Sequence, residues 1–101
     1  MAMAGILELA RVRIVAGQEA HFESAVVRTL PLLRRASGNQ GVSVRRSIEN
    51  PRSYVFLVQW ERVEDHVVGF MRSEDFKTFI QTIGVYFDGE PEIEHTVCVA
   101  S

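Results

Sequence analysis

A tryptophan and a histidine, six residues apart, are the side chains of this chain that are most suited to chemistry. Trp60 is the only tryptophan, and it lies at the end of an apolar run, residues 54–61. Its indole N–H needs a hydrogen-bond partner when the ring is buried, and an oxygenated substrate could supply one. His66 could act as a general base, because the pKa of a free imidazole is about 6.5. We therefore take Trp60 and His66 as candidate catalytic residues; the alternatives are a core tryptophan and an exposed helix histidine.

Other aromatic side chains could line a pocket around these two residues. Phe76 and Phe79 lie on one apolar helix stripe, a spacing that is also typical of core residues. Tyr86 lies in a loop with glycines on both sides, where its hydroxyl could meet a substrate. His95 shares a strand face with apolar residues, so it could instead be a core or dimer-interface histidine. The candidate substrate-binding residues are Trp60, Phe70, Phe76, Phe79, Tyr86 and His95.

The sequence argues against several other kinds of site. The three histidines are dispersed, with no HxH or HExxH spacing, and Cys98 is the only cysteine, so we expect neither a metal site nor an internal disulfide. No GxSxG, Walker or GxGxxG pattern is present, which leaves triad hydrolysis and nucleotide binding without support. The net charge of −2 argues against a nucleic-acid surface. We expect no cofactor.

The elements that must position these side chains follow from the periodicity of apolar residues. The expected order is strand, helix, strand, strand, helix, strand, which is the ferredoxin-like βαββαβ arrangement of the α+β class: a four-stranded antiparallel sheet with both helices on one face. Pro31 falls inside the first helical stripe, so we expect a kink or a restart there. Ser73 is the expected N-cap of the second helix, and Ile48 is expected to face the core. The expected strands are residues 6–14, 42–48, 54–61 and 92–99, and a short helical piece covers residues 64–71.

The third strand carries apolar residues on both of its faces, which predicts a partner. Val55 and Leu57 point one way, while the side chains of Tyr54, Phe56, Val58 and Trp60 point the other. Two helices can cover only one face of the sheet, and an uncovered apolar face is larger than soluble monomers usually expose. We therefore expect one domain, residues 1–101, that forms a homodimer through the open sheet face. The alternative is a monomer in which the loop at residues 84–92 covers that face.

Several short segments together resemble the antibiotic biosynthesis monooxygenase domain, a dimeric α/β-barrel group. They are residues 6–14 leading into Ala16-Gly17, Asn50-Pro51 followed by residues 54–61, Ser73 with Phe76 and Phe79, and residues 92–99. The resemblance implies oxygenation of phenols or quinols without a cofactor, because an electron-rich phenolate can reduce dioxygen itself. The protein then needs a pocket, a way to deprotonate the substrate, and hydrogen bonds to the developing charge. Dioxygen and a small aromatic molecule are the implied partners.

The same family contains haem-degrading enzymes, and the resemblance argues against that activity here. Those enzymes use an asparagine, a tryptophan and a histidine ligand at positions where this chain has Ala10, Phe70 and Ile80. None of these three can serve, and Ile80 cannot bind iron. Many quinol-oxidising members also have a histidine where Phe70 stands.

Two hypotheses for the function remain. The first is a cofactor-independent monooxygenase of a small aromatic, phenolic or quinol substrate, which the aromatic-rich interior favours. The second is a non-catalytic, dimeric ligand-binding or accessory protein on the same fold, which the phenylalanine at position 70 favours. The sequence leaves open whether Arg11 and Arg45 reach the cavity. With no signal peptide and no membrane-spanning run, we expect a cytoplasmic protein.

Overall fold

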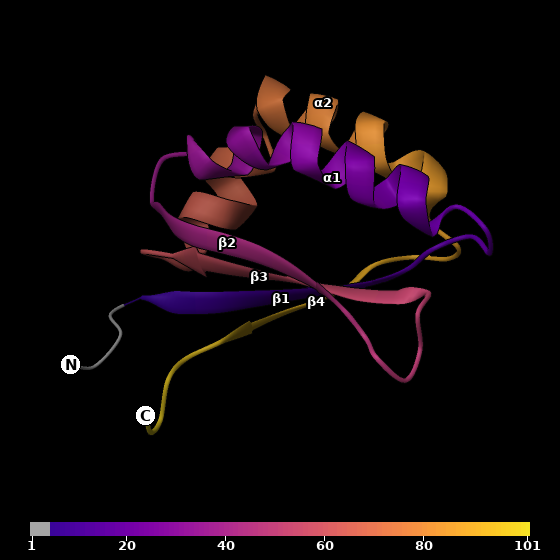
Figure 1. Ribbon diagram of the computed structural model, residues 1–101. Coiled ribbons are helices and arrows are strands. Elements are labelled where there is room, and N and C mark those ends of the chain that lie inside the picture. The colour runs from indigo at the N-terminus through magenta and orange to yellow at the C-terminus, as the bar shows by residue number, and fades with distance from the viewer. Residues whose placement is uncertain (1–4) are drawn as a thin grey trace.

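The computed structural model of the protein describes residues 5–101 and confirms the ferredoxin-like βαββαβ arrangement. Four antiparallel strands form one sheet in the order β2-β3-β1-β4, and the helices lie together on one face of it (Figure 1). None of the helices in residues 5–101 is long and apolar enough to cross a membrane. The elements are β1 (Ile6–Arg13), α1 (Glu19–Arg34), β2 (Asn39–Arg46), β3 (Ser53–Trp60), η1 (Asp65–Phe70), α2 (Glu74–Ile83), η2 (Gly84–Tyr86) and β4 (Glu92–Thr96).

The core lies between the sheet and the helices, and β3 contributes most to it. All four of its helix-facing side chains, Tyr54, Phe56, Val58 and Trp60, are buried. The side chains of Val55 and Leu57 alternate with them and are only half-buried on the open face. The predicted division of this strand into two apolar faces is confirmed.

Helix α1 packs the predicted stripe onto the sheet, and it does so without a break. Phe22, Ala25, Val26 and Leu33 are buried. The helix continues through Pro31, so the expectation of a restart is wrong. Pro31 lies in the last turn, where its missing N–H costs a single backbone bond and its own carbonyl still accepts the N–H of Arg35 at 3.1 Å.

Strands β2 and β4 both end earlier than the sequence prediction. β2 ends at Arg46, and Ile48 is 90% exposed in the turn, so its expected core position is wrong. The reason is the tight turn that follows, which the N–H of Ser47 closes on the carbonyl of Ser53 at 2.9 Å. β4 ends at Thr96, and the apolar residues beyond it are exposed.

Candidate active site

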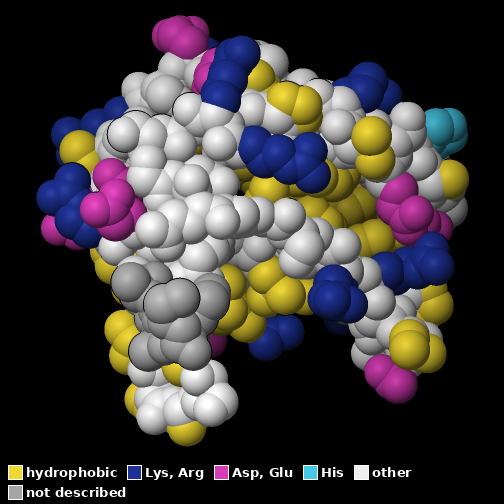
Figure 2. Space-filling view, turned by 60° about the vertical axis from the view of Figure 1, so that its left-hand side comes forward, with side chains coloured by type: hydrophobic (Ala, Val, Ile, Leu, Met, Phe, Trp, Pro, Cys, Tyr) yellow, Lys and Arg dark blue, Asp and Glu magenta, His cyan; other side chains and the backbone are white. Residues whose placement is uncertain are grey.

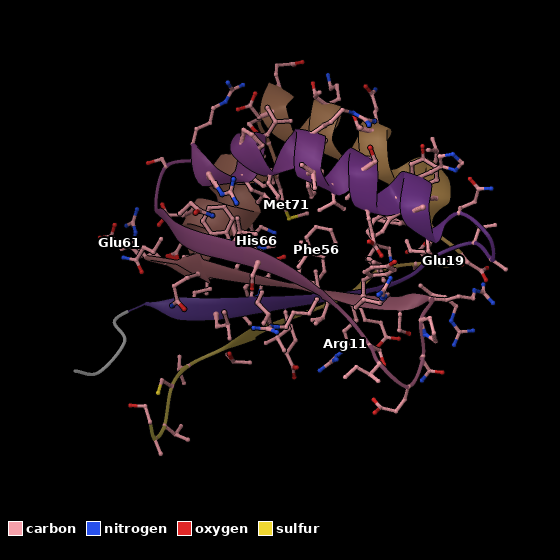
Figure 3. The ribbon with its side chains drawn as sticks, in the orientation of Figure 1. Arg11, Glu19, Phe56, Glu61, His66 and Met71 are labelled. Atoms are coloured by element: carbon pink, nitrogen blue, oxygen red, sulfur yellow. The ribbon has the colours of Figure 1, made fainter. Side chains whose placement is uncertain are left out.

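A cavity of about 610 Å³ lies between the sheet and the layer formed by η1 and α2. Its wall is mainly apolar, and the ionisable side chains that reach it are those of Glu8, His66 and Glu90. Phe56, His66 and Met71, which contribute to this wall, lie between the helices and the sheet in Figure 3. Five phenylalanines make the wall aromatic: Phe56, Phe70, Phe76, Phe79 and Phe87.

Two other hollows of similar size have no buried carboxyl or imidazole side chain among the residues that line them. One, of about 530 Å³, lies on the open side of the sheet and is lined by Arg11, Arg13 and Arg45 among others. The other, of about 650 Å³, lies between α1 and β2. Figure 2 shows hydrophobic surface in a hollow on that side of the molecule, bordered by charged side chains. We therefore place the candidate site in the aromatic cavity.

Glu8 is a buried carboxylic acid on the helix-facing side of β1. Its side chain lies on the same face as Ala10 and Val12, and the residue is 5% exposed. The indole N–H of Trp60 donates a hydrogen bond of 2.8 Å to Glu8 Oε1. Burial raises the pKa of Glu8 above its ordinary value, and the hydrogen bond from Trp60 opposes that rise. Glu8 is thus a carboxyl group held in place by Trp60 at the wall of the cavity.

His66 connects Glu8 to a second histidine. Its ring stacks on Trp60, with ring centroids 5.5 Å apart and 17° between the planes. Its Nε2 lies 3.5 Å from Glu8 Oε1, and its Nδ1 lies 2.8 Å from His95 Nε2, close enough for one ring to donate to the other. Burial, and secondly the neighbouring His95, lower the pKa of His66 to about 4. His66 is therefore uncharged at neutral pH.

The backbone that carries His66 has an unusual local geometry. Residues 65–70 form a single π-helical turn, closed by the N–H of Met71 and the carbonyl of His66 at 2.9 Å. Such turns are rare in proteins in general, and those that occur are often found at functional sites. This one buries both His66 and Phe70. Gly38 packs against the start of the turn, where a Cβ atom would lie 2.2 Å from Asp65 Oδ2, and its φ of +83° also favours glycine.

The structure brings four of the predicted site residues together. Trp60, His66 and His95 are linked through the contacts described above, and the rings of Trp60 and Phe70 are 5.9 Å apart. Among the predicted substrate-binding residues, Phe70, Phe76 and Phe79 line the cavity.

The remaining predicted residues lie behind or beside the cavity wall. Trp60 is completely buried behind Glu8 and His66, and His95 lies behind His66. Tyr86, in η2, packs against the core, and its carbonyl accepts the N–H of Val15 at 2.9 Å. None of these three is among the residues that line the cavity.

The sequence reasoning missed Glu8, which the structure places at the centre of the cluster. The signal was present, because Glu8 lies on the same strand face as Ile6, Ala10, Val12 and Ile14 and is the one acid on that apolar face. A lone carboxylate at a core-facing strand position carries a desolvation cost, and such a residue is therefore a candidate for a functional role.

Two arginines whose position the sequence left open lie elsewhere. Arg11 is on the opposite side of the sheet from the helices (Figure 3), and both Arg11 and Arg45 line the hollow on that side.

The cluster is suited to proton transfer rather than to metal binding. Ionised Glu8 can accept a proton from a ligand in the cavity, because its carboxyl group lines the wall and burial raises its pKa, which makes the carboxylate a stronger base. Both ring nitrogens of His66 already face protein partners. Within residues 5–101, no group of three or more histidine, cysteine, aspartate or glutamate side chains is arranged to hold a metal ion.

Comparison with known proteins gives a consistent result. Residues 5–82 match the sequence model of the antibiotic biosynthesis monooxygenase family. A crystal structure from Bordetella bronchiseptica, of a protein assigned to these monooxygenases, is 38% identical, with a TM-score of 0.93 over 97% of this chain and 100% of that one. YczJ, an uncharacterized protein of Bacillus subtilis, is 29% identical over 90 residues, which are 89% of this chain and 95% of YczJ.

A more distant structure shares the fold. SnoaB, a cofactor-independent oxygenase from Streptomyces nogalater, is 18% identical and has a TM-score of 0.81 over 97% of each chain.

Proposed function

The chain belongs to the antibiotic biosynthesis monooxygenase family, and we propose that it is a cofactor-independent monooxygenase of a small aromatic phenol or quinol. The observation that carries the proposal is the buried carboxyl group of Glu8, which Trp60 holds at the wall of an aromatic cavity. This is the base that such a reaction needs and that the sequence did not reveal.

In the proposed reaction, Glu8 removes the acidic proton of the bound substrate. The resulting phenolate or enolate is electron-rich, so it can transfer electrons to dioxygen without a metal or flavin. For a substrate with a reactive CH₂ group, one oxygen atom of O₂ becomes the new carbonyl oxygen, and the other leaves as water with the two hydrogens. The substrate supplies all the electrons. Burial raises the pKa of Glu8, so its ionised carboxylate is a stronger base, which supports its role as proton acceptor.

The aromatic wall supports the choice of substrate class. Planar ligands bury their faces well against phenylalanine rings, and a cavity of about 610 Å³ is of the size that binds small organic molecules. An apolar wall also strengthens the electrostatic interactions of a reacting anion with the few polar groups present.

We assign the two histidines to the return of the proton from Glu8. His66 Nε2 is the nearest basic atom to Glu8 Oε1, at 3.5 Å, and His66 Nδ1 is 2.8 Å from His95 Nε2. His95 is only half-buried on β4. The order Glu8, His66, His95 therefore leads from the cavity toward solvent. His66 and His95 act on the substrate only through Glu8 and are positioning residues in this scheme.

We also propose that the protein is a homodimer in which two open sheet faces pack together. Leu7, Leu9, Val55 and Leu57 form the apolar part of this face, and all four side chains are half-buried in the single chain. A second copy of the same face would cover them under a twofold axis.

A specific observation favours a second candidate function, a non-catalytic ligand-binding protein. Trp60 is completely buried and does not line the cavity, so the side chain that most suggested an oxygenase has no direct access to a ligand there.

Oxygen uptake by chelator-treated protein on a panel of anthrones and hydroquinones separates the two candidates. We expect turnover by the wild type and a rate at least 100-fold lower in Glu8→Gln. A loss of this size is typical when the general base of a reaction is removed. Glu74→Gln, on the solvent side of α2 and outside the cavity wall, is the control and should keep wild-type activity. A Glu8→Gln variant with wild-type activity would exclude Glu8 as the base. Binding without oxygen uptake across the panel would favour the second candidate.

A further inference from the structure

We propose that the cavity excludes anionic ligands and that its substrate is an uncharged aromatic molecule, without a carboxylate or phosphate group. The inference rests on the proposed function for the idea that the ligand is a substrate. It concerns binding alone, so it can be tested without turnover.

The charges of the cavity wall all have the same sign. The ionisable residues of the wall are Glu8, Glu90 and His66. Within residues 5–101, no lysine or arginine lines the cavity, although the chain has 11 of them. A ligand carboxylate inside would therefore have acidic neighbours and no lysine or arginine beside it.

Basic residues on or near the elements that form the cavity lie outside its wall. Lys77, on α2, is bonded to Glu74 at 3.3 Å on the solvent side. Arg35, at the end of α1, is bonded to Asp75 by two contacts of 2.6 and 2.7 Å. Arg11 and Arg45 line the hollow on the opposite side of the sheet. The fold thus separates its cations from the aromatic cavity.

The one remaining nitrogen base of the wall cannot act as a counter-ion. His66 is buried, and its pKa of about 4 leaves the ring uncharged at neutral pH. A buried anion without a cationic partner carries a large desolvation cost. Repulsion from the Glu8 carboxylate would add to that cost whenever Glu8 is ionised.

The same wall suits an uncharged hydroxyl-bearing ring. Phe56, Phe70 and Phe79 offer apolar surface to its faces, and Glu8 offers an acceptor to its hydroxyl group. Glu90 is exposed at the cavity, where a negative charge disfavours the approach of anions but not of neutral molecules.

Calorimetric titration under nitrogen with 1-naphthol and 1-hydroxy-2-naphthoate tests the proposal. The two compounds share the ring system and differ by one carboxylate. We expect 1-naphthol to bind at least tenfold more tightly at pH 7.5. Equal affinities, or tighter binding of the carboxylate, would overturn the proposal. Failure of both to bind would overturn it too, because the cavity would then not be a site for small aromatics.

A gain-of-function variant provides a second test. Ile93 lies at the cavity and is 49% exposed, so Ile93→Arg can place a cation at the rim without burying it. We expect this variant to bind 1-hydroxy-2-naphthoate at least tenfold more tightly than the wild type does. Val97→Arg, which adds the same charge to an exposed position outside the wall, should leave both affinities unchanged. An equal gain in both variants would show that net charge, and not the wall, sets the preference.

Failure of this inference is distinguishable from failure of the proposed function. If neither compound class supports oxygen uptake but the charge preference is found, the oxygenase proposal fails and the inference stands. If oxygen uptake is found but carboxylated compounds bind as well as neutral ones, the oxygenase proposal stands and this inference fails.

Discussion

Acidification should destabilise this protein through His66, by an amount that follows from its environment. His66 is 4% exposed, and its pKa is lowered from 6.5 to about 4. Below pH 6.5 the unfolded chain binds a proton at this site and the folded chain does not, so the free energy of unfolding falls as the pH falls. The loss levels off below pH 4. At about 1.4 kcal/mol for each pKa unit, it reaches about 3 kcal/mol.

The assay is urea denaturation at several pH values between 7.5 and 4, followed by the fluorescence of Trp60, at one protein concentration. His66→Phe can keep the stacking on Trp60 but cannot titrate at this position. Between pH 7.5 and pH 4, its free energy of unfolding should therefore fall less than that of the wild type, and the difference between the two falls should reach about 3 kcal/mol. Glu8 and His95, which face the ring, are present in both proteins. His21→Gln, at an exposed position, should follow the wild type. Parallel pH profiles for the wild type and His66→Phe would refute the reasoning.

Three further predictions concern the fold and the assembly. Phe22→Ala should cost about 3 to 5 kcal/mol of unfolding free energy, measured by urea denaturation, because Phe22 is completely buried with its ring centroid 4.7 Å from that of Tyr54; a loss below 1 kcal/mol would contradict this packing. Ser73→Ala should cost about 1 kcal/mol, because Ser73 Oγ accepts the N–H of Phe76 at 3.1 Å at the start of α2, and Ser73→Asp should restore most of it. Light scattering should give a dimer for the wild type and a monomer for Leu57→Asp, since the charge would lie on the proposed interface; a monomeric wild type at micromolar concentration would contradict the dimer.

The sequence was a good guide wherever one local rule decided the structure. The alternation of side chains along β3 correctly predicted which of them face the helices. The N-cap at Ser73 was predicted from its hydroxyl group and from the two acidic residues that follow it in sequence. Ile48 was misplaced because alternation does not say where pairing stops, and the turn at Ser47 ended the strand two residues early.

The candidate site was harder to predict because it depends on contacts across the sheet. Glu8 and Trp60 are 52 residues apart in sequence, and no local rule pairs them. His66 and His95 meet only because η1 sits over β4, and the π-helical turn that aims His66 has no clear sequence signature. Tyr86 had the right chemistry, but η2 packs it against the core beside the cavity.

The central claim, cofactor-free oxygenation at the Glu8 cavity, is tested most directly by isotope transfer from ¹⁸O₂. Chelator-treated protein is incubated with an anthrone substrate under ¹⁸O₂, and the product is analysed by mass spectrometry. We expect one ¹⁸O atom in the enzymatic product of the wild type and of Glu74→Gln, and only background product in Glu8→Gln. The central claim would be contradicted if the wild type formed product no faster than buffer does, or if Glu8→Gln formed it as fast as the wild type.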